Sequence, residues 1–238
     1  MILLNKKRII LFILIIFVSI IIYLVCFNDK ENSKIIPVSN IDFSKKVVII
    51  DAGHGAPDYG AESKNGVSEA NINLTISLKL KEKLESNNFS VILTRENEEG
   101  IFDSNSKTIK AMKNSDLKNR VKIGNNSNAD IFVSIHLNKI AQEKYWGWQT
   151  FFKNSSEESK RLAECIQKAI NEVITDRQNK RAALSISNKY LTDNIKIPTT
   201  IVECGFLSNN EEEKLLQTEE YQDKLVEGIY NGIAKYFE

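Results

Sequence analysis

Cysteine and proline are scarce in this sequence of 238 residues. Its three cysteines, Cys26, Cys165 and Cys204, show no framework spacing, which argues against a fold built on disulfides, although a single Cys165–Cys204 bridge stays open. Three prolines and ten glycines are too few for a long disordered or collagen-like part. With 42% hydrophobic and 26% charged residues, the composition is that of a globular protein.

The chain also lacks an excess of charge of either sign. It has 32 basic and 31 acidic residues, and without the N-terminal cluster Lys6-Lys7-Arg8 the basic residues fall to 29. The remainder therefore carries a net charge near −2, and no basic surface is expected. This argues against nucleic acid as a partner.

The first 27 residues differ in composition from the rest. The cluster Lys6-Lys7-Arg8 precedes an apolar run from Ile9 to Phe27, which as a helix would span about 28 Å and nearly match a hydrocarbon core of about 30 Å. The length of this run predicts that residues 1–27 are one transmembrane anchor. Because basic flanks stay in the cytoplasm, the rest of the chain is expected outside. Residues 28–44 then form a linker, and residues 45–238 form an extracytoplasmic domain. A cleaved signal peptide is the alternative, although no small-x-small cleavage site follows.

Short apolar runs alternate with helical patterns beyond this linker. Runs typical of buried strands occur at 47–51, 89–94, 131–135, 148–152 and 199–203, and the fourth is interpreted as an edge strand. Apolar residues at helical spacing predict helices over 69–86, 108–126, 157–174 and 221–237. In the second helix, Leu117, Val121 and Ile123 are expected to face inward. The alternation predicts an α/β fold, a three-layer αβα sandwich around a mainly parallel sheet.

The only two histidines of the chain each follow a predicted buried strand. His54 stands in Asp51-Ala52-Gly53-His54-Gly55, and His136 ends Ser134-Ile135-His136. Ligands of parallel sheets gather at the carboxyl ends of the strands, and glycines on both sides of His54 let the backbone turn sharply there. Either histidine alone could be structural, but together they favour a zinc site.

A catalytic zinc usually takes three protein ligands and a water. Glu69, at the start of the first helix, is the candidate third ligand, with Glu62 and Asp58 as rivals; an acid that only favours the helix dipole is the alternative. Glu203 ends an apolar strand, where a buried carboxylate needs a partner or serves as a catalytic base. Cys204 should point to the opposite face of that strand and is interpreted as packing.

Six blocks of the sequence resemble the zinc-dependent N-acetylmuramoyl-L-alanine amidases of the type 3 class. The resemblance covers about residues 46–238, with the blocks in order. The blocks are Ile50-Asp51-Ala52-Gly53-His54-Gly55, Glu69-Ala70-Asn71-Ile72-Asn73-Leu74, Leu93-Thr94-Arg95, Leu117 with Arg120, Val133-Ser134-Ile135-His136-Leu137-Asn138, and Val202-Glu203-Cys204-Gly205-Phe206-Leu207-Ser208-Asn209.

The resemblance implies that His54, Glu69 and His136 bind Zn²⁺ and that Glu203 is the catalytic residue. Zinc would lower the pKa of its water toward about 7. Glu203 would take a proton from this water and pass one to the leaving amine. The bond attacked joins the lactyl group of N-acetylmuramic acid to L-alanine, so the partner is a peptidoglycan strand with its stem peptide.

Two departures from the family pattern concern access to the site. Ala56-Pro57 replaces a glycine that usually follows His-Gly, which should stiffen the loop without removing a ligand. Some members insert a helix that blocks the zinc, but the segment between His136 and the helix at 157 is too short for one. The site should therefore be open, with restraint supplied by expression, by an accessory protein or by substrate choice.

Substrate contacts are less defined. Arg181, with Lys180, could bind a substrate carboxylate or form a solvated face, and Asn138 is a further candidate contact. Trp146 and Trp148 could stack on a sugar or pack inside the domain.

The compact, anchored organisation most resembles spore-cortex amidases of endospore formers. These remove stem peptides so that a deacetylase acting afterwards can form muramic-δ-lactam, which would place this chain between forespore and mother cell. A vegetative or septal amidase, a zinc peptidase and an inactive peptidoglycan-binding module are the alternatives.

Overall fold

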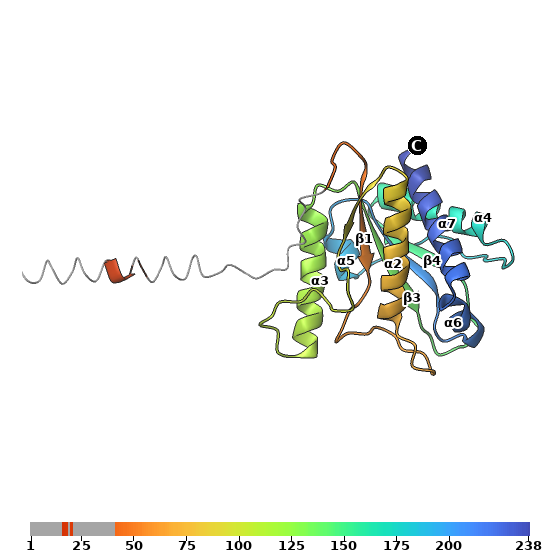
Figure 1. Ribbon diagram of the computed structural model, residues 1–238, viewed down its shortest axis with the longest axis horizontal. Coiled ribbons are helices and arrows are strands. Elements are labelled where there is room, and N and C mark those ends of the chain that lie inside the picture. Colours follow the sequence, from red (N-terminus) through yellow and green to blue (C-terminus); the bar gives the residue numbers. More distant parts are fainter. Residues whose placement is uncertain (1–15, 19, 21–40) are drawn as a thin grey trace, which may run out of the picture. The chain divides into compact units, whose positions relative to one another are not determined.

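The computed structural model describes residues 16–18, 20 and 41–238, within two compact units, Met1–Ile35 and Ile36–Glu238 (Figure 1). Most of the predicted anchor and linker, with Cys26, lies outside the described residues. No helix in the described part of the chain is long and apolar enough to cross a membrane. The anchor stays a prediction.

Six strands form one sheet in the second unit. They are β1 (Val47–Ala52), β2 (Ser90–Leu93), β3 (Ile131–Asn138), β4 (Gln149–Lys153), β5 (Leu184–Ile186) and β6 (Thr199–Phe206), in the spatial order β2-β1-β3-β6-β4-β5. All neighbours are parallel except β4 and β6, which are antiparallel. The predicted α/β fold with a mainly parallel sheet is confirmed. The prediction of β4 as an edge strand is wrong, because the short β5 pairs with its outer side.

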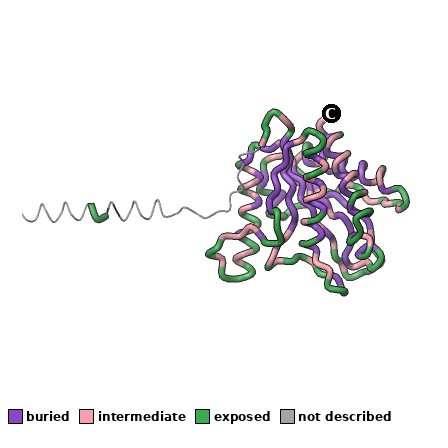
Figure 2. The backbone as a smooth tube through the Cα atoms, viewed as in Figure 1, coloured by how far each residue is buried: buried purple, intermediate pink, exposed green. Residues whose placement is uncertain are grey.

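Helices lie on both faces of this sheet (Figure 1). They are α2 (Glu69–Ser86), α3 (Ile109–Asn126), α4 (Glu157–Val173), α5 (Tyr190–Asn194), α6 (Asn210–Leu216) and α7 (Glu219–Phe237). Alternate side chains of β1 point to opposite faces of the sheet. Val48 and Ile50 pack in the larger core with α2 and α7, and Val47 and Ile49 pack in a smaller core beside α3 and α5. Figure 2 shows the resulting buried centre.

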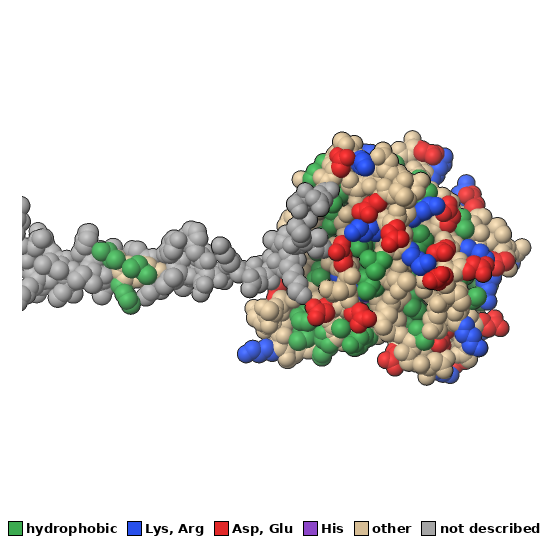
Figure 3. All heavy atoms as spheres, viewed as in Figure 1, with side chains coloured by type: hydrophobic (Ala, Val, Ile, Leu, Met, Phe, Trp, Pro, Cys, Tyr) green, Lys and Arg blue, Asp and Glu red, His purple; other side chains and the backbone are tan. Residues whose placement is uncertain are grey.

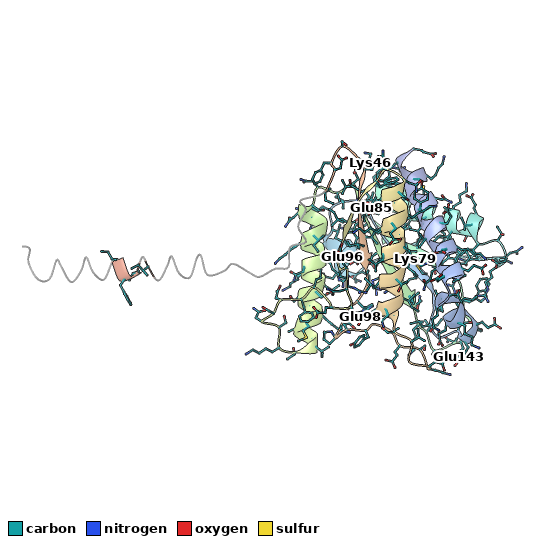
Figure 4. All side chains as sticks on the ribbon, viewed as in Figure 1. Lys46, Lys79, Glu85, Glu96, Glu98 and Glu143 are labelled. Atoms are coloured by element: carbon teal, nitrogen blue, oxygen red, sulfur yellow. The ribbon has the colours of Figure 1, made fainter. Side chains whose placement is uncertain are left out.

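The helix starts follow from local sequence. Side chains cap α3, α4 and α7 at Thr108, Ser156 and Thr218, each accepting a hydrogen bond from the backbone N–H of the third residue of its helix. Between helices, Lys79 reaches from α2 to α7, where its Nζ lies 2.7 Å from Asp223 Oδ1 (Figure 4 labels Lys79).

One helix prediction needs correction. Val121 and Ile123 of α3 pack against the smaller core as expected, but Leu117 is 37% exposed and lines a cleft instead. Helical spacing predicts an inward position for Leu117. Its exposure instead follows from the cleft that α3 borders, which the spacing does not reveal.

The remaining expectations concern cysteines and charge. Cys165 and Cys204 are both free, so the bridge left open by the sequence is absent. On the face drawn in Figure 3, acidic and basic side chains are interspersed, in keeping with the balanced composition.

Candidate metal centre

The structure brings His54, Glu69 and His136 together at the carboxyl end of the sheet. His54 follows β1, Glu69 opens α2, and His136 lies on β3. Glu69 Oε1 is 3.3 Å from His54 Nε2 and 3.0 Å from His136 Nδ1. One ligand atom from each residue lies within 4.8 Å of the other two, so these residues form a candidate metal site.

The donor set fits a zinc ion. A tetrahedral zinc with bonds of about 2.0–2.2 Å places its ligand atoms about 3.3–3.5 Å apart. The separations of Glu69 Oε1 from His54 Nε2, 3.3 Å, and from His136 Nδ1, 3.0 Å, are close to that spacing. Two imidazoles and a carboxylate are also a common ligand set of catalytic zinc.

Two glycines make room for these ligands. A β-carbon on Gly53 would overlap the imidazole of His136. One on Gly60, whose φ is +71°, would lie 2.7 Å from His54 Cδ2. His54 itself has a φ of 63°, which is uncommon for a residue with a side chain and signals a constrained turn. Gly53, for which the sequence predicts a sharp turn, thus also permits the close approach of His136.

Asp58, a rival for the third ligand position, instead contacts the ring nitrogen of His54 that faces away from Glu69. Its Oδ2 lies 3.1 Å from His54 Nδ1, and its Oδ1 lies 2.8 Å from Lys113 Nζ. A partner on the second ring nitrogen fixes the ring orientation of a metal-binding histidine. Burial by itself would lower the pKa of His54, but Asp58 and Glu69 outweigh burial and raise it to about 9. Glu62, the other rival, is exposed and outside the cluster.

Hydrogen bonds also fix Glu69 itself. Its Oε2 accepts from Ala61 N at 2.7 Å, and its Oε1 accepts from Leu137 N at 3.1 Å. Burial alone would raise its pKa, but His136 and His54 more than offset burial and hold the pKa of Glu69 below its ordinary value. The carboxylate is therefore ionised and oriented for a cation.

Glu203 faces the centre from the neighbouring strand. It is the register partner of His136 across β3 and β6. Its Oε2 is buried and has no hydrogen-bond partner among the described residues. Burial raises the pKa of its carboxyl group above the ordinary value. Cys204 beside it is fully buried on the opposite face, as expected for packing.

A buried ion pair under the site was not assigned a role from sequence, although both partners stand in the quoted blocks. Asp51 is paired with Arg120 Nη1 and accepts from Ser134 Oγ at 2.5 Å and Thr94 Oγ1 at 2.7 Å. Arg120 Nη2 donates to the carbonyl oxygen of His54 at 2.5 Å. The pair therefore connects the centre of the sheet to the backbone of a candidate ligand.

Arg95 also binds the backbone of this loop. Its guanidinium donates to the carbonyl oxygens of Ala52, Gly53 and Ala70 at 2.9, 3.1 and 2.7 Å. Ala70 follows Glu69 at the start of α2, so this side chain fixes the loop of one ligand against the helix of another. Only an arginine offers enough N–H groups in one plane for this.

The centre lies in a cleft of about 720 Å³. Asn138, a candidate substrate contact, lines this cleft, whereas Arg181 does not: its guanidinium bonds Trp146 O at 3.3 Å and Gln149 Oε1 at 3.2 Å. Trp148 is fully buried, so it packs in the core. Residues 139–148, between β3 and β4, contain no helix, in line with the expected absence of a plug.

An α/β sheet that brings together a His-Glu-His cluster and a facing glutamate is an arrangement suited to metal-assisted hydrolysis. The sequence profile of the N-acetylmuramoyl-L-alanine amidase family matches residues 48–235, and the chain belongs to this family. It is accordingly an enzyme that hydrolyses peptidoglycan amides.

Particular relatives cover nearly all of the domain. The germination-specific N-acetylmuramoyl-L-alanine amidase of Bacillus subtilis is 34% identical over 218 residues, which are 92% of this chain and 90% of that protein. The CwlD amidase of Clostridioides difficile, solved in complex with the GerS lipoprotein, is 47% identical with a TM-score of 0.78, covering 81% of this chain and 98% of that one. Another amidase from Clostridium difficile 630 is 33% identical with a TM-score of 0.71, covering 81% and 97%.

Proposed function

We propose that this enzyme binds Zn²⁺ through His54, Glu69 and His136 and cleaves the amide between the lactyl group of N-acetylmuramic acid and L-alanine during spore-cortex maturation. The observation that carries the proposal is the convergence of these three side chains with an unpartnered Glu203 in one open cleft. Cleavage would release the stem peptide from the glycan.

When bound, the zinc supplies a Lewis acid that activates water and polarises the scissile carbonyl. The protein supplies the proton transfers. Glu203 Oε2 has no competing hydrogen bond among the described residues, so it can accept a proton. Its raised pKa also suits it to deliver that proton to the departing amine. Asp58 keeps the His54 ring in place during these steps.

The cellular role is supported by the relatives. One is named germination-specific, and a second is the CwlD amidase in complex with a lipoprotein. We extend both features to this chain: a role in preparing cortex for muramic-δ-lactam formation, upstream of a deacetylase, and an accessory partner outside the cytoplasm. The N-terminal segment would anchor the enzyme in the membrane, in the space between forespore and mother cell.

Mass analysis of digested peptidoglycan tests the reaction. We expect free stem peptides that begin with L-alanine and glycan strands with free lactyl carboxylates. Peptides cut internally while the lactyl amides stay intact would contradict the proposal and indicate a peptidase. Deleting the gene should remove muramic-δ-lactam from cortex muropeptides, and normal lactam content would refute the spore role while leaving the chemistry intact.

The variant Glu203→Gln isolates the role of the carboxyl group. It preserves shape and leaves the candidate ligands untouched, so the protein should fold and bind metal. We expect turnover to fall by about 10²–10⁴-fold, the usual contribution of a general acid–base group. Turnover equal to wild type would remove Glu203 from the mechanism.

A further inference from the structure

The cleft continues past Glu203 over an apolar part of the sheet. Ile201 lies two residues before Glu203 on the same face of β6, and Phe151 of β4 is its register partner. With Ile186 of β5, these side chains are only partly buried and line the cleft. We call Ile201, Phe151 and Ile186 the open sheet face.

The strand order gives the cleft a direction. Across the sheet, His54 follows β1, His136 lies on β3 and Glu203 on β6, and the open sheet face begins at Ile201 on β6 and extends over β4 and β5. On the other side of the metal centre the wall of the cleft is formed by α3, through Lys113 and Leu117. A substrate that crosses the metal centre therefore meets α3 with one end and the open sheet face with the other.

The chemistry decides which end is which, and this step rests on the proposed function. Glu203 passes its proton to the leaving amine, so the nitrogen of L-alanine must lie beside Glu203. The stem peptide continues from that nitrogen, and it leaves the metal centre on the side of β6. The glycan then lies toward α3.

One of the lysines that line the cleft has no partner in the described part of the chain, and it follows Ile186 of the open sheet face by three residues. Three lysines line the cleft. Lys113 Nζ lies 2.8 Å from Asp58 Oδ1, and Lys139 Nζ donates to the carbonyl oxygen of Glu62 at 2.5 Å. Lys189 is exposed and makes no ion pair or side-chain hydrogen bond within the described part of the chain. It immediately precedes α5, beside the cleft-lining Tyr190 and Leu191.

We propose that the open sheet face is the stem-peptide subsite and that Lys189 binds the free α-carboxylate of the glutamate that follows L-alanine. The apolar side chains Ile201 and Phe151 would receive the methyl group of L-alanine. The residue after L-alanine in the stem peptide carries a free carboxylate. Lys113 and Lys139 have partners already, so Lys189 is the lysine of the cleft that can bind this carboxylate. Lys189 thus acts as a specificity residue that favours acidic over amidated stem peptides.

The test compares two substrates in four proteins. The substrates are a muramoyl tetrapeptide with this carboxylate free and its counterpart with the carboxylate amidated. The proteins are wild type, Lys189→Met, Lys189→Arg and the control Lys168→Met, which removes an exposed lysine from α4. Bound zinc is measured in each, so that a change in the metal centre is seen separately.

For Lys189→Met we expect KM for the free acid to rise about fivefold with kcat unchanged, as for loss of one solvent-accessible ion pair. KM for the amidated substrate should not change. Lys189→Arg and Lys168→Met should behave as wild type. An equal effect on both substrates, or no effect on either, would overturn the proposal.

Binding of the released tetrapeptide, measured by calorimetry, separates this inference from the proposed function. Weaker binding of the free-acid peptide by Lys189→Met than by wild type supports the subsite, and equal binding refutes it. Failure of the wild-type protein to cleave the lactyl amide would instead contradict the proposed function.

Discussion

Replacing Asp51 by Asn tests whether the buried ion pair supports the site. Asp51 is 1% exposed and Arg120 is 2% exposed, so neither charge is solvated by water. The substitution keeps the shape of the side chain but removes the negative charge that faces Arg120. It leaves Arg120 with Asp116, whose Oδ2 lies 2.5 Å from Arg120 Nε.

The expected loss of stability follows from these contacts. Breaking a buried pair by removing one partner costs about 3–5 kcal/mol because a charge is left uncompensated. Since Asp116 still compensates Arg120 in part, we expect the lower end, about 3 kcal/mol. For a domain of this size that is a fall in Tm of about 6–12 °C.

The dependence on pH gives a second signature. Burial by itself raises the pKa of Asp51, but Arg120, Ser134 and Thr94 outweigh burial and hold the pKa below its ordinary value. A carboxyl group with a lowered pKa in the folded state stabilises the fold above its unfolded pKa of about 3.9, and this contribution is lost as the pH falls further. Below about pH 4, the stability of wild type should therefore fall more steeply than that of Asp51→Asn.

Urea unfolding of the compact unit Ile36–Glu238, followed by circular dichroism between pH 3 and pH 7, measures both effects. Asp223→Asn is the control, since it removes an exposed partner of Lys79 and should cost about 0.5 kcal/mol or less. A loss below about 1 kcal/mol for Asp51→Asn at pH 7, or one equal to the control, would refute the reasoning.

Three further predictions concern packing and metal. Gly53→Ala should weaken metal binding by about tenfold or more in chelator competition, because its β-carbon overlaps the His136 ring; wild-type affinity would contradict this. Gly232→Val should cost about 1–3 kcal/mol in urea unfolding, because a β-carbon there would lie 2.8 Å from Ile166 N where α7 meets α4; unchanged stability would show that the helices can separate freely. Chelation should lower the stability by about 2.7 kcal/mol relative to protein with free zinc at one hundred times its Kd, and an unchanged Tm would mean that the folded state holds no metal.

Much of the fold could be predicted because its long elements carry periodic apolar residues. The helices at Glu69–Ser86, Ile109–Asn126 and Glu157–Val173 lie within one residue of their predicted bounds. The short elements β5, α5 and α6 were not predicted, since three to seven residues show no clear periodicity. Their places depend on neighbours distant in sequence.

The two histidines of the site could be found because histidine is rare and both copies lie at the carboxyl ends of buried strands. Glu69 was one of several candidate acids by spacing, and only the family resemblance singled it out. The supporting residues could not be interpreted in the same way. Asp51 and Arg120 are 69 positions apart, and no local pattern shows that they meet. The same holds for Arg95, whose bonds to Gly53 and Ala70 exist only once β1, β2 and α2 are packed.

The metal content of four purified proteins tests the assignment of the site most directly. Mass spectrometry of the metal in wild type, His136→Ala, Glu69→Gln and Glu203→Gln should find one zinc per chain in wild type and in Glu203→Gln, and a strong loss in the other two. Lactyl-amide cleavage should proceed at the full rate in wild type alone. Stoichiometric zinc in His136→Ala and Glu69→Gln, or loss of zinc from Glu203→Gln, would contradict the division between residues that hold the metal and the residue that moves the proton.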